Sequence, residues 1–132
     1  MITPAKIQVR FSDLDVLGHV NNTIYLSYFE MARVHYFKEL LGEGWDWNKF
    51  GIVLAKNEVE YFKSVLLNHE PLITIFTEHI GSKSFTLGYE LHVNNELFAR
   101  GKSIQVCFDA STQKSILVPV QMRLQLERII RE

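Results

Sequence analysis

The residues whose types could do chemistry lie close together near the start of the chain. Asp15 carries a carboxylate and His19 an imidazole, and both groups serve as general bases in enzymes. Asn21 and Asn22 follow, and asparagine is a common residue at the start of a helix. A helix N-terminus presents backbone N–H groups and a partial positive charge, which can stabilise a developing negative charge. The segment therefore predicts a catalytic site in a loop that leads into a helix.

A long apolar helix is predicted directly after this loop, over residues 22–41. Side chains recur there at the 3.6-residue period on one broad stripe of Tyr25, Phe29, Ala32, Tyr36 and Leu40. A second set covers much of the opposite side: Leu26, Val34, Phe37 and Leu41. We therefore expect the rest of the protein to enclose this helix heavily. Gly42 and Gly44 are expected to end it.

Strands are predicted on both sides of the helix in the sequence. Residues 6–12 alternate apolar and polar side chains, as a half-buried strand does. The period is two again from Gly51, and further strands are expected at 72–81, 85–93, 97–109 and 116–118, before a C-terminal helix that starts at Pro119 and has a stripe of Met122, Leu126, Ile129 and Ile130. The order predicts an α+β fold, in which a curved antiparallel sheet wraps around one long central helix, in a single domain over residues 1–132.

Composition excludes several classes of protein. Hydrophobic residues make up 47% of the 132 residues, which argues against disorder, and a net charge of −1 argues against nucleic acid as the main partner. No apolar segment resembles a signal peptide or is long enough to span a membrane, so a cytoplasmic location is expected. Cys107 is the single cysteine, which excludes an internal disulfide and a cysteine-rich metal site. We expect it to be a buried thiol in a strand.

Two segments of the chain resemble a known family. Residues 11–22 read Phe-Ser-Asp-Leu-Asp-Val-Leu-Gly-His-Val-Asn-Asn, and residues 25–33 read Tyr-Leu-Ser-Tyr-Phe-Glu-Met-Ala-Arg. Together they resemble the signature of the 4-hydroxybenzoyl-CoA thioesterases, which are hotdog-fold acyl-CoA thioesterases. Strand segments at 59–63, 82–85 and 106–109 extend the resemblance over nearly the whole chain. Ser64 and His69-Glu70 depart from the family pattern, so ligand contacts of that connection are not carried over.

The resemblance implies an activity and an assembly. The expected reaction is hydrolysis of an acyl-CoA to a carboxylic acid and CoA. No metal and no separate cofactor are expected, because the coenzyme A is part of the substrate. The chain is expected to form a homodimer or homotetramer with sites between subunits, and open strand edges of such a sheet would favour this pairing.

The resemblance also assigns roles to individual residues. Asp15 is expected to be the catalytic carboxylate, acting as nucleophile or as general base toward water. The backbone N–H of Asn22 is expected to stabilise the oxyanion. His19 orients water or the thioester, or else its ring bonds to backbone. On its own, a loop aspartate such as Asp15 could instead cap the helix. Asp13 is expected to be a structural turn residue.

Substrate-binding residues are expected around the mouth of the pocket. Tyr25 belongs to a wall of tyrosine and phenylalanine side chains for the acyl group. Lys83, Ser84 and Arg100 are candidates to bind the phosphates of CoA, and each could equally be a solvated surface residue. Glu30 and Arg33, three residues apart on the helix, are expected to form an ion pair.

Two other functions remain open at the level of the sequence. An enoyl-thioester hydratase could use Asp15 and His19 on water and a carbon–carbon double bond. A non-catalytic module that binds acyl thioesters could keep the same loop for structural reasons. The sequence does not distinguish aromatic from aliphatic acyl groups, nor CoA from acyl carrier protein.

Overall fold

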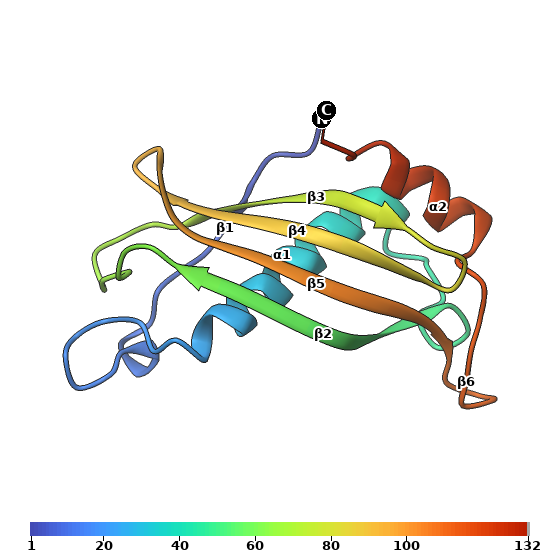
Figure 1. Cartoon of the computed structure of the whole chain (residues 1–132), viewed down its shortest axis with the longest axis horizontal. Coiled ribbons are helices and arrows are strands. Elements are labelled where there is room, and N and C mark those ends of the chain that lie inside the picture. Colours follow the sequence, from blue (N-terminus) through green and yellow to red (C-terminus); the bar gives the residue numbers. More distant parts are fainter. Residues whose placement is uncertain (132) are drawn as a thin grey trace.

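The computed structural model describes residues 1–131 and consists of a curved antiparallel sheet packed against one long helix, α1 (Ile24–Leu41) (Figure 1). The strands lie in the order β1-β3-β4-β5-β2, and β6 pairs with β5. Their bounds are β1 (Ala5–Lys6), β2 (Gly51–Tyr61), β3 (Leu72–Ile80), β4 (Ser84–Val93), β5 (Glu96–Asp109) and β6 (Lys114–Ser115). A short 3₁₀ helix, η1 (Phe11–Asp13), precedes α1, and α2 (Val120–Glu127) follows the sheet. The predicted architecture is confirmed.

Helix α1 ends where the sequence predicts, but it begins two residues later than the predicted start. Gly42 has a φ of 79°, and its N–H donates to the carbonyl of Lys38, which ends the helix. At the other end, Thr23 is the residue that precedes the first helical turn. The Asn21 side chain accepts hydrogen bonds from the N–H and hydroxyl of Thr23, so it organises the entry to the helix from one turn earlier.

The expectation that α1 is heavily enclosed holds for only one of its sides. The predicted stripe of Tyr25, Phe29, Ala32, Tyr36 and Leu40 is buried against the sheet. On the other side, Phe37 is buried and its ring meets that of Trp47, whereas Leu26 is 37% and Val34 66% exposed. A single curved sheet covers one side of a helix, so this second face is only partly covered within residues 1–131. Helix α1 therefore has more apolar side chains than this one chain buries.

The inner face of the sheet is shaped to receive α1. β4 contributes large apolar side chains, among them Phe85 and Leu87, whereas β5 contributes Ala99, Gly101, Ser103, Gln105 and Cys107. A Cβ at Gly101 would lie 2.3 Å from the ring of Phe29, so only glycine lets the helix approach this closely. As expected, Cys107 is buried in a strand, and burial raises the pKa of its thiol to about 11.

Three predicted elements differ in extent. The strand expected at 6–12 is reduced to β1, because the chain stops pairing with β3 after Lys6 and turns into η1. As a result, Phe11 is 81% exposed. The strand expected at 116–118 lies instead at β6. Helix α2 follows Pro119 as predicted, and Met122 and Leu126 are buried, but it ends at Glu127, so Ile129 and Ile130 lie beyond it.

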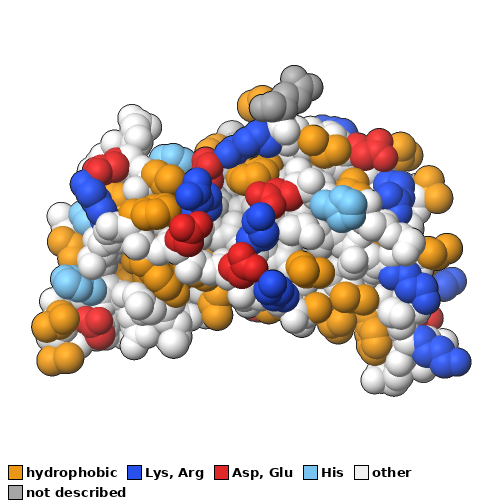
Figure 2. Space-filling model, in the orientation of Figure 1, with side chains coloured by type: hydrophobic (Ala, Val, Ile, Leu, Met, Phe, Trp, Pro, Cys, Tyr) orange, Lys and Arg blue, Asp and Glu red, His pale blue; other side chains and the backbone are white. Residues whose placement is uncertain are grey.

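The outer face of the sheet carries alternating charges (Figure 2). Ion pairs join strands there: Arg100 of β5 pairs with Glu60 of the neighbouring β2, and Lys102 of β5 pairs with Glu78 of β3 across β4. Such exposed pairs add little stability but keep this face hydrated. Within residues 1–131, neither helix combines the length and the apolar character that crossing a membrane requires.

Candidate active site

The loop that carries Asp15 is closed by its own backbone. Leu14 and Val20 form an antiparallel bridge, and the N–H of Asp15 donates to the carbonyl of His19 over 2.7 Å. The N–H of Gly18 donates to the carbonyl of Asp15. Gly18 has a φ of 78°, which residues other than glycine adopt only with backbone strain. The Gly18 position therefore explains why the predicted turn can bring His19 back beside Asp15.

One oxygen of the Asp15 carboxylate is held and the other is available. Oδ1 accepts hydrogen bonds from the N–H groups of Leu17 at 2.9 Å and His19 at 3.1 Å. No described residue donates a hydrogen bond to Oδ2. The carboxylate thus bonds within its own loop and does not cap α1, which excludes the helix-capping alternative for Asp15. A fixed carboxylate with one open oxygen can attack a carbonyl or deprotonate water.

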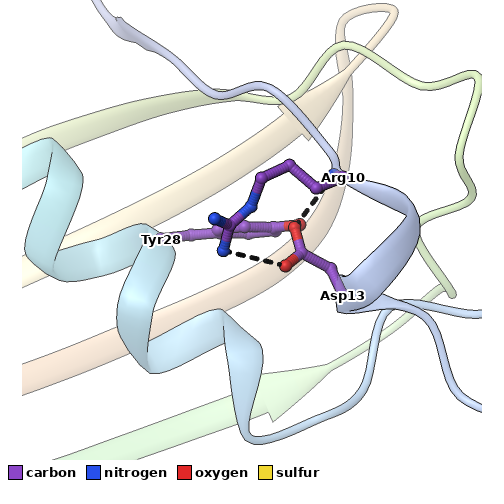
Figure 3. A network of polar contacts seen from close by, with 3 residues as sticks. All are labelled: Arg10, Asp13 and Tyr28. Carbon is purple, nitrogen blue, oxygen red and sulfur yellow. Dashed lines mark hydrogen bonds and ion pairs between the residues drawn. The ribbon is translucent and has the colours of Figure 1, made fainter.

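Asp13 anchors the same loop to α1 (Figure 3). Its Oδ2 accepts hydrogen bonds from the hydroxyl of Tyr28 at 2.6 Å and from the N–H of Arg10 at 3.0 Å, and Oδ1 pairs with the Arg10 guanidinium at 3.2 Å. Burial raises the pKa of Asp13, but the bonds from Tyr28 and Arg10 outweigh it and hold this pKa below its usual value. The backbone carbonyl of Asp13 also accepts from Asn21. Asp13 is therefore the structural turn residue that the sequence predicts.

A small pocket of about 150 Å³ brings four of the candidate residues together. Asp15, His19, Asn22 and Tyr25 all line it. The carbonyl of Asn22 accepts a hydrogen bond from the Tyr61 hydroxyl at 2.9 Å. The N–H of Asn22 has no acceptor among the described residues. Asn22, with a backbone N–H that has no partner, therefore lines the same pocket as Asp15.

Tyr25 and Tyr61 form a wall of this pocket. Their rings meet edge to face with centroids 4.9 Å apart. The Tyr25 hydroxyl accepts a hydrogen bond from the N–H of Val65 at 3.3 Å, and burial raises its pKa. Since the hydroxyl already bonds the backbone, Tyr25 serves as a rigid apolar surface beside the carboxylate. His19 contributes its ring to the same pocket, and no described residue forms a hydrogen bond with that ring.

The three residues expected to bind CoA phosphates do not line this pocket. Lys83 and Ser84 lie at the turn between β3 and β4. The loop of Asp15 bridges to Leu66 beyond the other end of the sheet, so about 30 Å of strand separates the two regions. Arg100 lies on the outer face, where it pairs with Glu60 and stacks over the ring of Phe62 at 5.5 Å.

Five residues that the sequence analysis did not select as candidates also line the pocket: Val20, Tyr61, Phe62, Lys63 and Ser64. The last three directly follow β2, which ends at Tyr61. Lys63 pairs with Glu96 and lies over the ring of Phe98 at 5.9 Å, so a cation stands at the mouth of the pocket. In the sequence, Lys63 could have been found as a candidate through the segment Tyr61-Phe62-Lys63, which carries part of the family resemblance. Among residues 1–131, no group of three or more His, Cys, Asp or Glu side chains is arranged to hold a metal ion.

The fold and the site define a class of protein. A curved antiparallel sheet around one long helix is the hotdog fold, which solved thioesterases share with this chain. The chain belongs to the thioesterase-like superfamily, whose model matches residues 9–126.

Individual relatives agree with this assignment. The long-chain acyl-CoA thioesterase FadM of Escherichia coli is 27% identical over 131 residues, which cover 96% of this chain and 98% of FadM. The uncharacterized protein YsmA of Bacillus subtilis is 39% identical over 86 residues, which cover 64% of this chain and 56% of YsmA. A thioesterase from Thermus thermophilus, solved in complex with coenzyme A and Zn, is 30% identical with a TM-score of 0.84, and the match covers 96% of this chain and 92% of that one.

Proposed function

We propose that this thioesterase hydrolyses an acyl-CoA, with Asp15 as the catalytic carboxylate. The observation that carries the proposal is the Asp15 side chain, held through Oδ1 by two backbone N–H groups while no described residue bonds Oδ2. This geometry fixes the carboxylate in a pocket that Asn22 also lines. The similarity to a long-chain acyl-CoA thioesterase and to a thioesterase that binds coenzyme A supports CoA as the carrier.

The reaction then follows from the two groups in the pocket. Asp15 Oδ2 attacks the thioester carbonyl carbon, or it removes a proton from a water molecule that attacks. Negative charge develops on the carbonyl oxygen and is stabilised by the Asn22 N–H, which costs no internal hydrogen bond because that donor has no partner among the described residues. The C–S bond breaks, the CoA thiolate takes up a proton, and water supplies the hydroxyl of the carboxylic acid.

Lys63 is proposed to attract the phosphates of CoA. Its ammonium group stands at the pocket mouth, and its ion pair with Glu96 is half exposed, so a phosphate can compete for it. Lys83, Ser84 and Arg100 remain proposals for contacts made across subunits, since none of them lines the Asp15 pocket of its own chain.

A homodimer or homotetramer is proposed for the same protein. β2 is an edge strand of eleven residues, and Val53 and Leu54 on it are 44% and 46% exposed. Together with the uncovered side of α1, this edge leaves backbone and apolar groups that a second copy would cover. Light scattering tests the assembly, and an active monomer at micromolar concentration would contradict it. A cytoplasmic location stays a prediction from the sequence.

Thiol release from a panel of acyl-CoAs tests the function directly. A thioesterase frees CoA, which a thiol reagent detects, whereas a hydratase changes the enoyl absorbance without freeing CoA and a binding module does neither. Added hydroxylamine then distinguishes the two roles of Asp15. A nucleophilic carboxylate forms a mixed anhydride that hydroxylamine traps, so hydroxamate should form faster than in the enzyme-free reaction of hydroxylamine with the thioester. With a general base, hydroxamate should form only at that enzyme-free rate.

A further inference from the structure

A second cavity lies between α1 and β2, away from the Asp15 pocket. It has a volume of about 420 Å³, within the range of small-molecule sites. Its walls are mostly apolar: Val34, Phe37, Trp47, Ile52 and Leu54. Five polar or charged side chains also line it. Glu30, Lys38 and Glu43 are 73%, 61% and 78% exposed, whereas the side chain of Arg33 is only 11% exposed and Gln105 only 1%. Buried polar groups in an apolar cavity point to a ligand with a matching polar group.

The side chains of Arg33 and Gln105 belong to one buried chain of hydrogen bonds. The Arg33 guanidinium donates to the Tyr89 hydroxyl at 2.9 Å, and that hydroxyl lies 2.6 Å from the Ser103 hydroxyl. The amide nitrogen of Gln105 donates to the same Ser103 oxygen at 3.0 Å. The ring of Tyr89 stacks on Phe29 with centroids 4.5 Å apart. The network therefore holds Arg33 and Gln105 at constant positions in the cavity.

Each of the two side chains has hydrogen-bonding capacity left over. Arg33 has five N–H donors, of which one serves Tyr89, and Glu30 is its other partner at 3.9 Å. No described residue donates to the amide oxygen of Gln105. Of the polar side chains that line the cavity, the two largely buried ones thus offer a donor, from Arg33, and an acceptor, from Gln105. A hydroxyl group satisfies both, because it accepts from the guanidinium and donates to the amide oxygen.

The cavity is within reach of a thioester held at Asp15. Tyr25 lines the Asp15 pocket and Arg33 the cavity, and they are eight residues apart on α1. That separation corresponds to about 12 Å along the helix axis, which an extended chain of roughly ten carbon atoms covers. A single aromatic ring is too short to reach from one to the other.

We propose that the cavity binds the far end of an aliphatic acyl chain that carries a hydroxyl group, with Arg33 and Gln105 as specificity-determining residues. The inference rests on the proposed thioesterase function, because it names the acyl class for the Asp15 site. A plain alkyl chain would displace water from both polar groups and offer no bond in return, so it binds less well. The hydroxylated chain is therefore the better substrate.

Two matched substrates test the proposal on the full-length protein. We expect kcat/KM for 10-hydroxydecanoyl-CoA to exceed that for decanoyl-CoA by at least about tenfold. Gln105→Met and Arg33→Met keep the approximate volume of the side chains and remove the polar groups, so this ratio should fall to about one while decanoyl-CoA is still hydrolysed. Arg128→Met, at the exposed end of α2, is the control and should leave the ratio unchanged.

A binding measurement separates this inference from the function on which it rests. Calorimetry with 10-hydroxydecanoate and decanoate requires no hydrolysis, and the hydroxylated acid should bind more tightly to the wild type but not to Gln105→Met. Equal kcat/KM for the two CoA esters would overturn the inference and leave the thioesterase function intact. Selective binding without thiol release would support the cavity and refute the function. If the variants altered dimer dissociation but not the substrate ratio, Arg33 and Gln105 would serve the contact between two copies and not the acyl chain, and the proposal would be wrong.

Discussion

Replacement of Asp15 by asparagine separates its chemistry from its structural role. Asparagine retains an Oδ1 that can accept both hydrogen bonds now made by the N–H groups of Leu17 and His19. Its amide nitrogen takes the place of Oδ2, to which no described residue donates. The loop therefore loses no internal bond, and the free energy of unfolding should change by no more than about 0.5 kcal/mol.

Activity should respond very differently. The amide is neither a base nor a nucleophile, so kcat should fall at least about 100-fold, the lower limit for lost general-base catalysis. That factor corresponds to about 2.7 kcal/mol in activation free energy. The assay is thiol release from the best acyl-CoA of the panel, together with thermal unfolding of both proteins.

Asp109→Asn provides a matched control for Asp15→Asn. Asp109 also accepts a hydrogen bond through Oδ1 from the N–H of the second residue after it, Ser111 at 2.9 Å, but it lies at the end of β5. This control should keep full activity. A folded Asp15→Asn protein with kcat close to that of the wild type would refute the assignment of Asp15 as the catalytic carboxylate.

Three further changes test the surroundings of the site. Asn22→Pro removes an N–H that no internal bond uses and should lower kcat about 100-fold, the scale of one lost oxyanion donor. Asn22→Ala keeps that N–H and should keep most of the activity. If the two variants had matched circular dichroism and equal rates, the N–H of Asn22 would not be the oxyanion donor. Tyr28→Phe removes the 2.6 Å bond to Asp13 and should destabilise the fold by about 1–3 kcal/mol in urea unfolding. Because the pKa of Asp13 is lowered in the folded state, its contribution to stability is complete above about pH 4 and is lost as the pH falls through the folded pKa, so acid unfolding of Tyr28→Phe should begin at a higher pH than that of the wild type. Cys107, buried and with a pKa raised to about 11, should react with a thiol reagent at pH 8 only after unfolding, and rapid labelling of the native protein would contradict its position.

The sequence by itself determined the elements that depend on neighbouring residues. The end of α1 at Gly42 follows from the left-handed φ that glycine adopts easily, and the turn at Asn94–Asn95 follows from the same tolerance in asparagine. The loop from Asp15 to His19 is local in the same sense, since its bonds join residues at most four apart. Short-range geometry of this kind can be predicted from the types of the residues and their spacing.

Only the tertiary structure decided which distant residues meet. Tyr61 reaches Asn22 across 39 residues, and Arg33 reaches Tyr89 across 56, because both contacts depend on how the strands are paired. A shift of one residue in that pairing would turn every side chain of a strand to the other face. On β5 the apolar Ile104 and Val106 alternate with Ser103 and Gln105, and the sequence pattern favours burying the apolar pair. The structure buries the polar pair instead, since small and polar side chains leave room for α1 and complete the network with Tyr89 and Arg33.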